Sequence, residues 1–328
     1  MIRKLITLLG KVGINGFLLG IFAAIFLGWL FPFAGADSSP FPWKPFINVG
    51  IAIVFFLYGV KLDPVQLRAG LRNWKLHLLI QSTTFVIFPA IVLIVASHLP
   101  WINSDFQLGI YYLSVLPSTV SASVVLVSIA RGNIPAAIFN ASISSLLGVV
   151  ITPAWMDLLG NDAQGDVEFL PTFLELTYKV ILPVFVGVLC HGKLFPKIQP
   201  FLNRLKYIDQ TVIMMIVFTA FSNSFEQKVF APYKISTLLE VSFTMLSIFI
   251  LMWFVIYCVC RLMRFTLEDE ITALFCASKK SLVHGVIIGN VIFPDPAILG
   301  LVLLPVMLYH IQQLILGSVI ASKLGRRI

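Results

Sequence analysis

The sequence predicts an all-α membrane protein in which ten transmembrane helices form two inverted five-helix repeats. Of its 328 residues, 59% are hydrophobic and 12% are charged, against about 45–50% and about 25% in soluble domains. A water-soluble fold of this size cannot hide that much apolar surface. The composition therefore excludes a soluble enzyme, a nucleic-acid-binding protein and a disordered chain. Long apolar stretches and an uneven distribution of basic residues support the same class.

Each predicted helix is an apolar stretch of the length that a bilayer core requires, about 30 Å or about 20 residues. No separate soluble domain remains outside these stretches. In chain order the predicted spans are residues 14–32, 46–61, 76–97, 107–130, 134–158, 171–192, 208–225, 236–260, 270–293 and 297–322.

The basic residues predict the orientation of these spans. With the N-terminus in the cytoplasm, 17 of the 23 Lys and Arg residues fall in inner segments and three fall in outer loops. This positive-inside asymmetry predicts a multi-pass protein of the inner (plasma) membrane with both termini in the cytoplasm. The net charge of +8 is then mostly a topology signal. The other three basic residues, Lys179, Lys279 and Lys280, lie within predicted spans.

The first span has one alternative interpretation, a cleaved signal peptide. Its basic start and the small residues Ala34-Gly35-Ala36 fit that pattern. The apolar stretch is long for a signal, however, and its removal would leave an odd number of spans.

An internal repeat divides the chain into residues 1–164 and 165–328. The segment Gly28-Trp29-Leu30-Phe31-Pro32 recurs as Gly192-Lys193-Leu194-Phe195-Pro196, at an offset of 164 residues. Pro117 and Ser281 mark polar interruptions at the same offset. Each half holds five predicted spans, and because five is odd the second half must be inverted in the membrane. This pattern is typical of transporters whose binding site lies between the repeats.

The fourth predicted span is interrupted at Pro117. Proline removes a backbone donor and clashes with the preceding turn, and in lipid the freed backbone groups need partners within the protein. Four hydroxyl residues follow it closely, and they either satisfy this backbone or coordinate a ligand: Ser118, Thr119, Ser121 and Ser123.

The ninth predicted span is interrupted by Lys279, Lys280, Ser281 and His284. A lysine in mid-span costs roughly 2.5–3.5 kcal/mol on insertion scales, although one of the two lysines can snorkel to an interface. Two interrupted spans at matching places indicate a transport site near the midplane. Half-helix N-termini and lysines at such a site favour an anion.

Other polar residues within spans are secondary candidates. Asn140 in the fifth span needs partners for its amide in a dry setting, and Gln81 and Thr84 lie in the third span. Five acidic residues lie close to span ends and are expected to face water or headgroups: Asp63, Glu175, Asp209, Glu240 and Glu270.

At these residues the chain resembles the sodium/bile-acid cotransporter family, solute carrier family 10, and within it the member-seven-like branch. The resemblance implies a panel domain (residues 14–61 and 171–225), a core domain (76–158 and 236–322), unwound helices 4 and 9 that cross, and a monomer. It places the substrate between panel and core. The likeness covers nearly the whole chain and is most specific at residues 136–140, 148–153, 280–285, 309–310 and 316–318.

The departures from the family pattern concern its two sodium sites. Where the family has a Ser-Asn pair in helix 4, this chain has Ser123 followed by valine. The family's Glu and Gln of helix 9 correspond to Lys280 and His284, and its helix-3 Gln corresponds to Thr84. We hypothesise that the Lys280 ammonium occupies the place of one sodium ion. Ser123 and Asn140 then either hold a remaining sodium ion or only brace the crossing.

The sequence thus predicts a secondary active transporter, a symporter that moves an organic anion or amphipathic solute by alternating access. The coupling ion is sodium or a proton, and no cofactor is expected apart from such a sodium ion. The main alternative is a membrane protein with a transporter fold that regulates ion homeostasis without steep solute flux. An intramembrane hydrolase built on Ser281 and His284 would leave the adjacent lysines unexplained, and broken, charged helices suit a carrier better than a channel.

Overall fold

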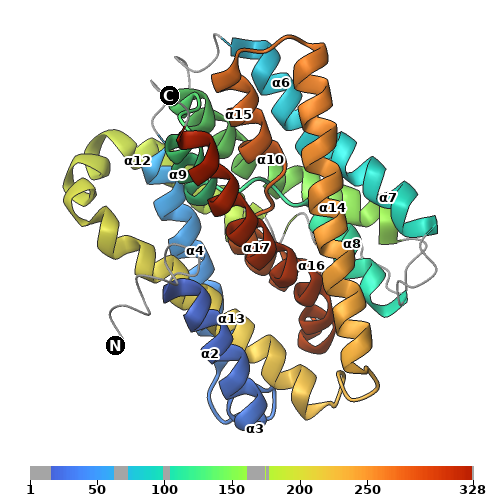
Figure 1. Ribbon diagram of the computed structural model, residues 1–328. Helices are drawn as coiled ribbons and strands as arrows, with labels where there is room; N and C mark the ends of the chain where they lie inside the picture. Colours follow the sequence, from blue (N-terminus) through green and yellow to red (C-terminus); the bar gives the residue numbers. More distant parts are fainter. Residues whose placement is uncertain (1–15, 63–72, 99–103, 161–173, 175–176, 327–328) are drawn as a thin grey trace, which may run out of the picture.

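The computed structural model describes residues 16–62, 73–98, 104–160, 174 and 177–326. The regular structure of these residues is helical throughout (Figure 1). The first half holds α2 (Gly16–Leu30), α3 (Pro32–Gly35), α4 (Trp43–Lys61), α6 (Trp74–Ser82), the π-helix η2 (Thr83–Ile87), α7 (Phe88–His98), α8 (Ser104–Val115), α9 (Ser121–Ile129) and α10 (Ile134–Gly160). The second half holds the π-helix η3 (Thr177–Ile181), α12 (Leu182–Ile198), the 3₁₀ helix η4 (Gln199–Phe201), α13 (Leu202–Glu226), α14 (Ile235–Leu262), α15 (Leu267–Ala277), α16 (Leu282–Ile292) and α17 (Pro296–Gly325).

The protein is a multi-pass membrane protein by the length and hydropathy of its helices. Eight helical segments within the described residues are long and apolar enough to cross a bilayer. They correspond to the second, third and fifth to tenth predicted spans. The first predicted span is seen as the 15-residue apolar helix α2, and the fourth as the two short helices α8 and α9. The count of ten spans therefore stays a prediction.

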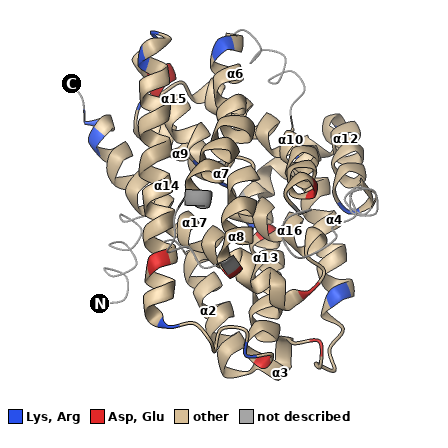
Figure 2. Ribbon diagram, turned by 90° about the vertical axis from the view of Figure 1, so that its right-hand side faces the viewer, with Lys and Arg blue, Asp and Glu red and all other residues tan. Residues whose placement is uncertain are grey.

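Charged residues gather at both ends of the bundle, and some also lie between the ends. Figure 2 shows charged ribbon on α6 and α15 at one end and beside α3 at the other, with mostly tan ribbon between them. The predicted topology places the start of α6 and of α15 on the inner side and α3 on the outer side, so their arrangement is the one that this topology requires. The side of the membrane that each end faces stays a prediction.

Helices α4 and α12 cross at a pair of glycines. A Cβ on Gly59 would clash with the carbonyl oxygen of Val184, and a Cβ on Gly187 would clash with that of Phe56. His191, one turn further along α12, hydrogen-bonds the carbonyl of Val60 through Nδ1 at 2.8 Å. Small residues let helix backbones approach closely in lipid, where apolar surface alone gives little drive to associate.

Helix α13 joins two groups of helices. It packs on α2, α3 and α4, which belong to the predicted panel, and also on α16 and α17 of the predicted core. In Figure 1, α2, α4, α12 and α13 lie on one side of α17, and α6, α7 and α14 lie on the other. The two inverted repeats and the division into panel and core remain predictions, because they concern symmetry and movement rather than contacts.

Candidate functional site

The two interrupted helices meet at their breaks. Helix α8 ends at Val115 and α9 begins at Ser121, while α15 ends at Ala277 and α16 begins at Leu282. The backbone N–H of Ser281 donates to the carbonyl of Pro117 at 2.9 Å. Gly148 of α10 makes room for this contact, since a Cβ there would lie 2.6 Å from the Pro117 ring. Main-chain groups from the two halves of the sequence thus bond directly.

Lys280 places its ammonium in a cage of backbone carbonyls. Its Nζ lies 2.8 Å from the oxygen of Thr84, 2.6 Å from that of Ser114 and 2.9 Å from that of Leu116. The ring centroid of Phe88 lies 4.2 Å from the same nitrogen. The residue is 1% exposed. Three acceptors match the three protons of an ammonium group.

Local sequence explains why two of these carbonyls are available. In the π-helix η2 the N–H of Phe88 bonds Thr83 rather than Thr84, and the next residue, Pro89, has no N–H to offer. The carbonyl of Ser114 is also left without its usual helical partner, because the N–H of Ser118 donates to the hydroxyl of Ser144 at 2.9 Å.

Lys279 extends to a different set of neighbours. It is fully buried, and its Nζ donates to the carbonyl of Gln313 at 2.9 Å. The centroid of the Phe275 ring lies 5.8 Å away. A Cβ on Gly317 would lie 2.7 Å from the same nitrogen, so that glycine leaves the room in which the ammonium sits. The expectation that one lysine snorkels to an interface is therefore wrong, because both side chains are buried: Lys279 against α15 and α17, and Lys280 against η2, α7 and α8.

Gln313 lies in the tenth predicted span and belongs to the site, although it was not among the predicted site residues. Its Oε1 accepts from the N–H of Lys280 at 2.9 Å, and its Nε2 donates to the carbonyl of Lys280 at 2.7 Å and meets Nδ1 of His310 at 2.8 Å. The side chain thus replaces the helical partners that the break removes from Lys280. The signal for this role in the sequence is an amide inside an apolar span. In the structure the side chain is fully buried, where an amide needs hydrogen-bond partners.

A buried tyrosine serves the second break in a similar way. The hydroxyl of Tyr309 donates to the carbonyl of Ser278 at 2.6 Å. Buried carbonyls without partners are costly in the membrane, so this hydroxyl helps to hold the unwound segment. The hydroxyl of Tyr112 on α8 donates to the carbonyl of Gly285 at 2.7 Å and so ties α8 to the first turns of α16.

The hydroxyls after Pro117 bond mainly to backbone. Ser118 donates through Oγ to the carbonyl of Cys276 at 2.5 Å, and Ser123 donates to that of Phe275 at 3.2 Å. Thr119 and Ser123 share a hydrogen bond of 2.7 Å between their hydroxyls. Ser121 is the first residue of α9. The described bonds therefore tie the start of α9 to the end of α15.

Asn140 and Gln81 form a separate polar cluster between α6 and α10. Nδ2 of Asn140 lies 2.8 Å from Nδ1 of His77 and donates to the carbonyl of Ala136 at 2.8 Å. Nε2 of Gln81 lies 3.2 Å from Oδ1 of Asn140, while its own Oε1 is buried without a hydrogen bond. Within the described residues no hydrogen bond joins Asn140 to Ser123, and no group of His, Cys, Asp or Glu side chains suits a metal ion. A sodium ion at Ser123 and Asn140 stays a prediction.

His284 faces the predicted panel. Its Nδ1 lies 2.9 Å from the hydroxyl of Ser281, which also caps the start of α16 by accepting from the N–H of His284. The ring centroid of His284 lies 5.5 Å from that of Tyr58 and 6.1 Å from that of Phe55, both on α4. The aromatic side of α4 therefore contacts the second helix break directly.

One prediction about the acidic residues is wrong. Glu270 does not face water or headgroups; its side chain is 7% exposed and pairs with Arg261 at 3.1 Å. The turn between α14 and α15 folds the basic end of one helix over the acidic start of the next, which the span boundaries alone did not reveal. Glu240 is exposed as expected, and Asp63 and Glu175 lie outside the described residues.

Asp209 is also more enclosed than expected. Its side chain is 15% exposed, and its Oδ2 lies 3.8 Å from Nζ of Lys61 on α4. Its Oδ1 is buried without a hydrogen bond. The carboxylate therefore sits between α4 and α13 rather than in open water.

A cavity of about 590 Å³ opens where the predicted panel meets the predicted core. Lys179, Asn48 and Asn223 line it from the panel side, and Asn290 and Phe293 line it from the core side. Cavities of about 300–1,000 Å³ suit small-molecule ligands. Two lysines, one aspartate and three asparagines give the cavity a polar lining.

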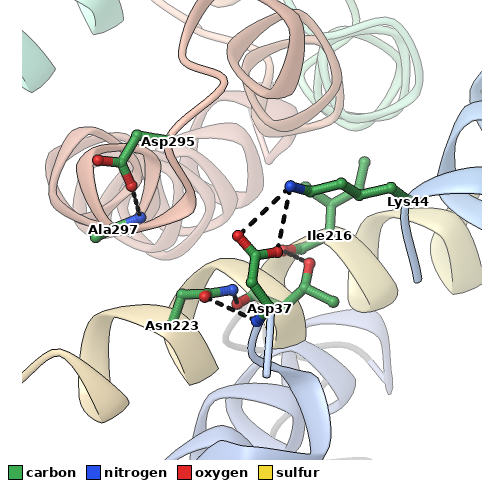
Figure 3. A network of polar contacts seen from close by, with 7 residues as sticks. Asp37, Lys44, Ile216, Asn223, Asp295 and Ala297 are labelled. Atoms are coloured by element: carbon green, nitrogen blue, oxygen red, sulfur yellow. Dashed lines mark hydrogen bonds and ion pairs between the residues drawn. The ribbon is translucent and has the colours of Figure 1, made fainter. Parts of the chain in front are cut away.

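A polar network forms one wall of this cavity (Figure 3). Lys44 pairs with the carboxylate of Asp37 at 3.3 Å, and the N–H of Asp37 donates to Oδ1 of Asn223 at 3.0 Å. Asp295 caps α17 by accepting from the N–H of Ala297 at 2.8 Å. The network fixes the segment after α3 against α13.

An apolar multi-pass helical bundle with two joined helix breaks and a polar cavity is typical of a membrane protein of the transporter class. Sequence comparison gives the family. The model of the SBF-like CPA transporter family matches residues 15–326, and the chain belongs to this family. It is 34% identical to the putative symporter YfeH of Escherichia coli, over 96% of this chain and 94% of that protein. It is 32% identical to sodium/bile acid cotransporter 7 of Rattus norvegicus (95% and 93% covered) and 30% identical to that of Danio rerio (95% and 94%).

Proposed function

We propose that this protein is a secondary active transporter that moves an organic anion or amphipathic solute by alternating access. The family and the names of its relatives, a putative symporter and sodium/bile acid cotransporters, support the transport class. In this proposal ten spans form two inverted repeats, and a core that carries the two breaks moves against a panel. The helix packing described above is compatible with that division.

The solute binds in the cavity between panel and core. Lys179 on η3 supplies positive charge, and Asn48, Asn223 and Asn290 supply neutral hydrogen-bonding groups. Positive charge among amides, together with the Phe293 ring, suits a solute with an anionic group and an apolar body. The predicted topology places this cavity on the outer side, so the protein would be open outwards.

The observation that carries the ion-coupling part of the proposal is the carbonyl cage around Lys280. Sodium in proteins is held by oxygen ligands, and three carbonyl oxygens lie within 2.9 Å of the Lys280 nitrogen. A lysine ammonium in such a cage satisfies the carbonyl oxygens as a bound cation would, but it cannot dissociate because it is covalently attached. The resemblance places a sodium ligand at this position, so we propose that Lys280 replaces one sodium ion.

Sodium-dependent melting tests this replacement without a known solute. The melting temperatures of wild type, Lys280→Ala and the exposed-site control Lys75→Ala are measured in detergent against sodium, with choline holding the ionic strength. A ligand at ten times its dissociation constant adds about 1.4 kcal/mol of stability. We expect a saturable sodium-specific rise that is new in Lys280→Ala or larger there than in wild type. An equal response in all three proteins would overturn the replacement.

Flux in proteoliposomes tests transport itself. A bile salt and smaller labelled organic anions are offered under an imposed sodium gradient or proton gradient. We expect concentrative uptake of at least one anion, reduced in Lys179→Ala and retained in Lys193→Ala, a lysine outside the cavity. Absence of gradient-driven uptake for the whole series would favour the alternative, a regulator of ion homeostasis with a transporter fold.

A further inference from the structure

The two adjacent lysines of the second break differ sharply in how their ammonium groups are satisfied. Lys280 has three carbonyl acceptors for its three protons. Lys279 has one acceptor among the described residues, the carbonyl of Gln313; its Nζ also lies beside Gly317 and 5.8 Å from the centroid of the Phe275 ring. Both side chains are buried. A charged Lys279 would therefore hold two N–H groups without acceptors in a dry site, which is costly.

No counter-charge compensates Lys279 in the described part of the chain. The titratable groups that interact electrostatically with Lys279 are Cys276 of α15 and His310 of α17. The Tyr309 hydroxyl of α17 is bonded to Ser278, and no ion pair in the described residues involves Lys279. With one acceptor and no counter-charge in this part of the chain, the site accommodates a neutral Lys279 amine better than an ammonium.

We propose that Lys279 binds and releases the coupling proton of this transporter, while Lys280 stays charged. The inference rests on the proposed function, to which it adds the coupling ion and the residue that carries it. As a neutral amine, Lys279 still donates to Gln313 and holds one N–H without an acceptor among the described residues, against two in the ammonium form. Once protonated, it requires either new acceptors from a rearranged break at residues 278–281 or the negative charge of a bound solute. Proton uptake, solute binding and movement of the break are thereby linked.

The position of Lys279 also suggests where the proton enters. Its nitrogen lies beside Gly317 of α17, which is six residues before Lys323 near the end of that helix. Six residues of α-helix span about 9 Å. The predicted topology puts that end in the cytoplasm, so we expect the proton to exchange with the inner side.

The test observes the two side chains directly and needs no solute. Protein labelled with ¹⁵N-lysine is studied in detergent between about pH 5 and about pH 9, a range that covers known buried lysines. The Nζ signals are assigned by their loss in Lys279→Met and Lys280→Met. We expect the Lys279 signal to move from the ammonium to the amine position as the pH rises, and the Lys280 signal to stay at the ammonium position. A Lys279 signal that remains at one position across the range, or movement of Lys280 instead, would overturn the proposal.

A second variant protects the test against a folding failure of the methionine variants. Gly317→Ala adds a methyl group 2.7 Å from the present position of the Lys279 nitrogen. We expect it to shift the midpoint of the Lys279 transition and leave Lys280 unchanged, whereas the control Gly192→Ala, with no atom within 4 Å of its new Cβ, shifts neither. Identical midpoints in Gly317→Ala and wild type would count against the local geometry on which the inference depends.

Melting gives an independent readout of the same proton. If Lys279 releases its proton in the folded protein, the unfolding equilibrium constant of wild type depends on pH. Its ratio to the constant of Lys279→Met then changes by up to tenfold per pH unit. A parallel pH dependence of the two proteins would contradict the proposal. None of these measurements requires transport. The absence of flux would therefore refute the proposed function, while the NMR and melting results would still decide whether Lys279 binds and releases a proton.

Discussion

Replacing Gln313 by Met should destabilise the protein far more than replacing its neighbour Gln312. The Gln313 side chain binds both the N–H and the carbonyl of Lys280, at 2.9 and 2.7 Å, in a segment that has no helical hydrogen bonds of its own. Methionine has a similar volume but no amide, so both backbone groups would be left buried without partners. Each such group costs about 1–3 kcal/mol. The expected loss for Gln313→Met is therefore roughly 2–6 kcal/mol.

Gln312→Met is the matched control. Nε2 of Gln312 bonds the carbonyl and hydroxyl of Ser242 at 2.8 and 2.9 Å, while its Oε1 is already without a partner. Its loss should cost about 1–2 kcal/mol. Thermal melting in detergent, at about 2–4 °C per kcal/mol, separates the two variants. Equal melting temperatures would show that the Gln313 amide does not hold the break, and the reasoning would be refuted.

Two further predictions concern regions outside the helix breaks. Gly187→Ala should lower the stability of the protein by about 1–3 kcal/mol, because the new Cβ meets the carbonyl of Phe56. The control Gly192→Ala has open space around its new Cβ, so its stability should be unchanged or rise by up to about 1 kcal/mol through helix propensity. Equal melting temperatures of the two variants would contradict the close crossing of α4 and α12. Burial, then the hydrogen bond to Asp105, raises the pKa of Tyr233 to about 12. Tyrosinate absorbance, as the difference between wild type and Tyr233→Phe, should therefore appear only near that pH, and earlier in Asp105→Asn. The stabilisation from this contact should be complete below about pH 10 and lost as the pH rises further; an unchanged onset in Asp105→Asn would contradict the role of the contact.

The positions of the helix breaks could be predicted because each break is marked by residues within the break itself. Pro117 removes a backbone donor within an apolar stretch, and two lysines in mid-span require an unusual environment. The boundaries of the helices on either side follow within a few residues. The membrane class, too, follows from composition alone, since apolar content on this scale has no place in a soluble fold.

The contents of the site could not be predicted in the same way, because they depend on contacts between distant segments. The cage around Lys280 uses Thr84, which is 196 residues away, and its availability depends on a π-helical turn ending at a proline. Gln313 differs from Gln312 only in which side of α17 it occupies. Glu270 was misplaced because its partner, Arg261, lies across a turn whose geometry no hydropathy pattern specifies.

The bond between the two breaks runs from the Ser281 N–H to the Pro117 carbonyl, so it involves no side-chain atom. Every amino acid except proline supplies that donor, and every amino acid supplies that acceptor. The bond between the two halves therefore does not depend on the chemistry of the neighbouring side chains. Under the proposal above, a carboxylate can be exchanged for an ammonium at position 280 without removing this main-chain contact.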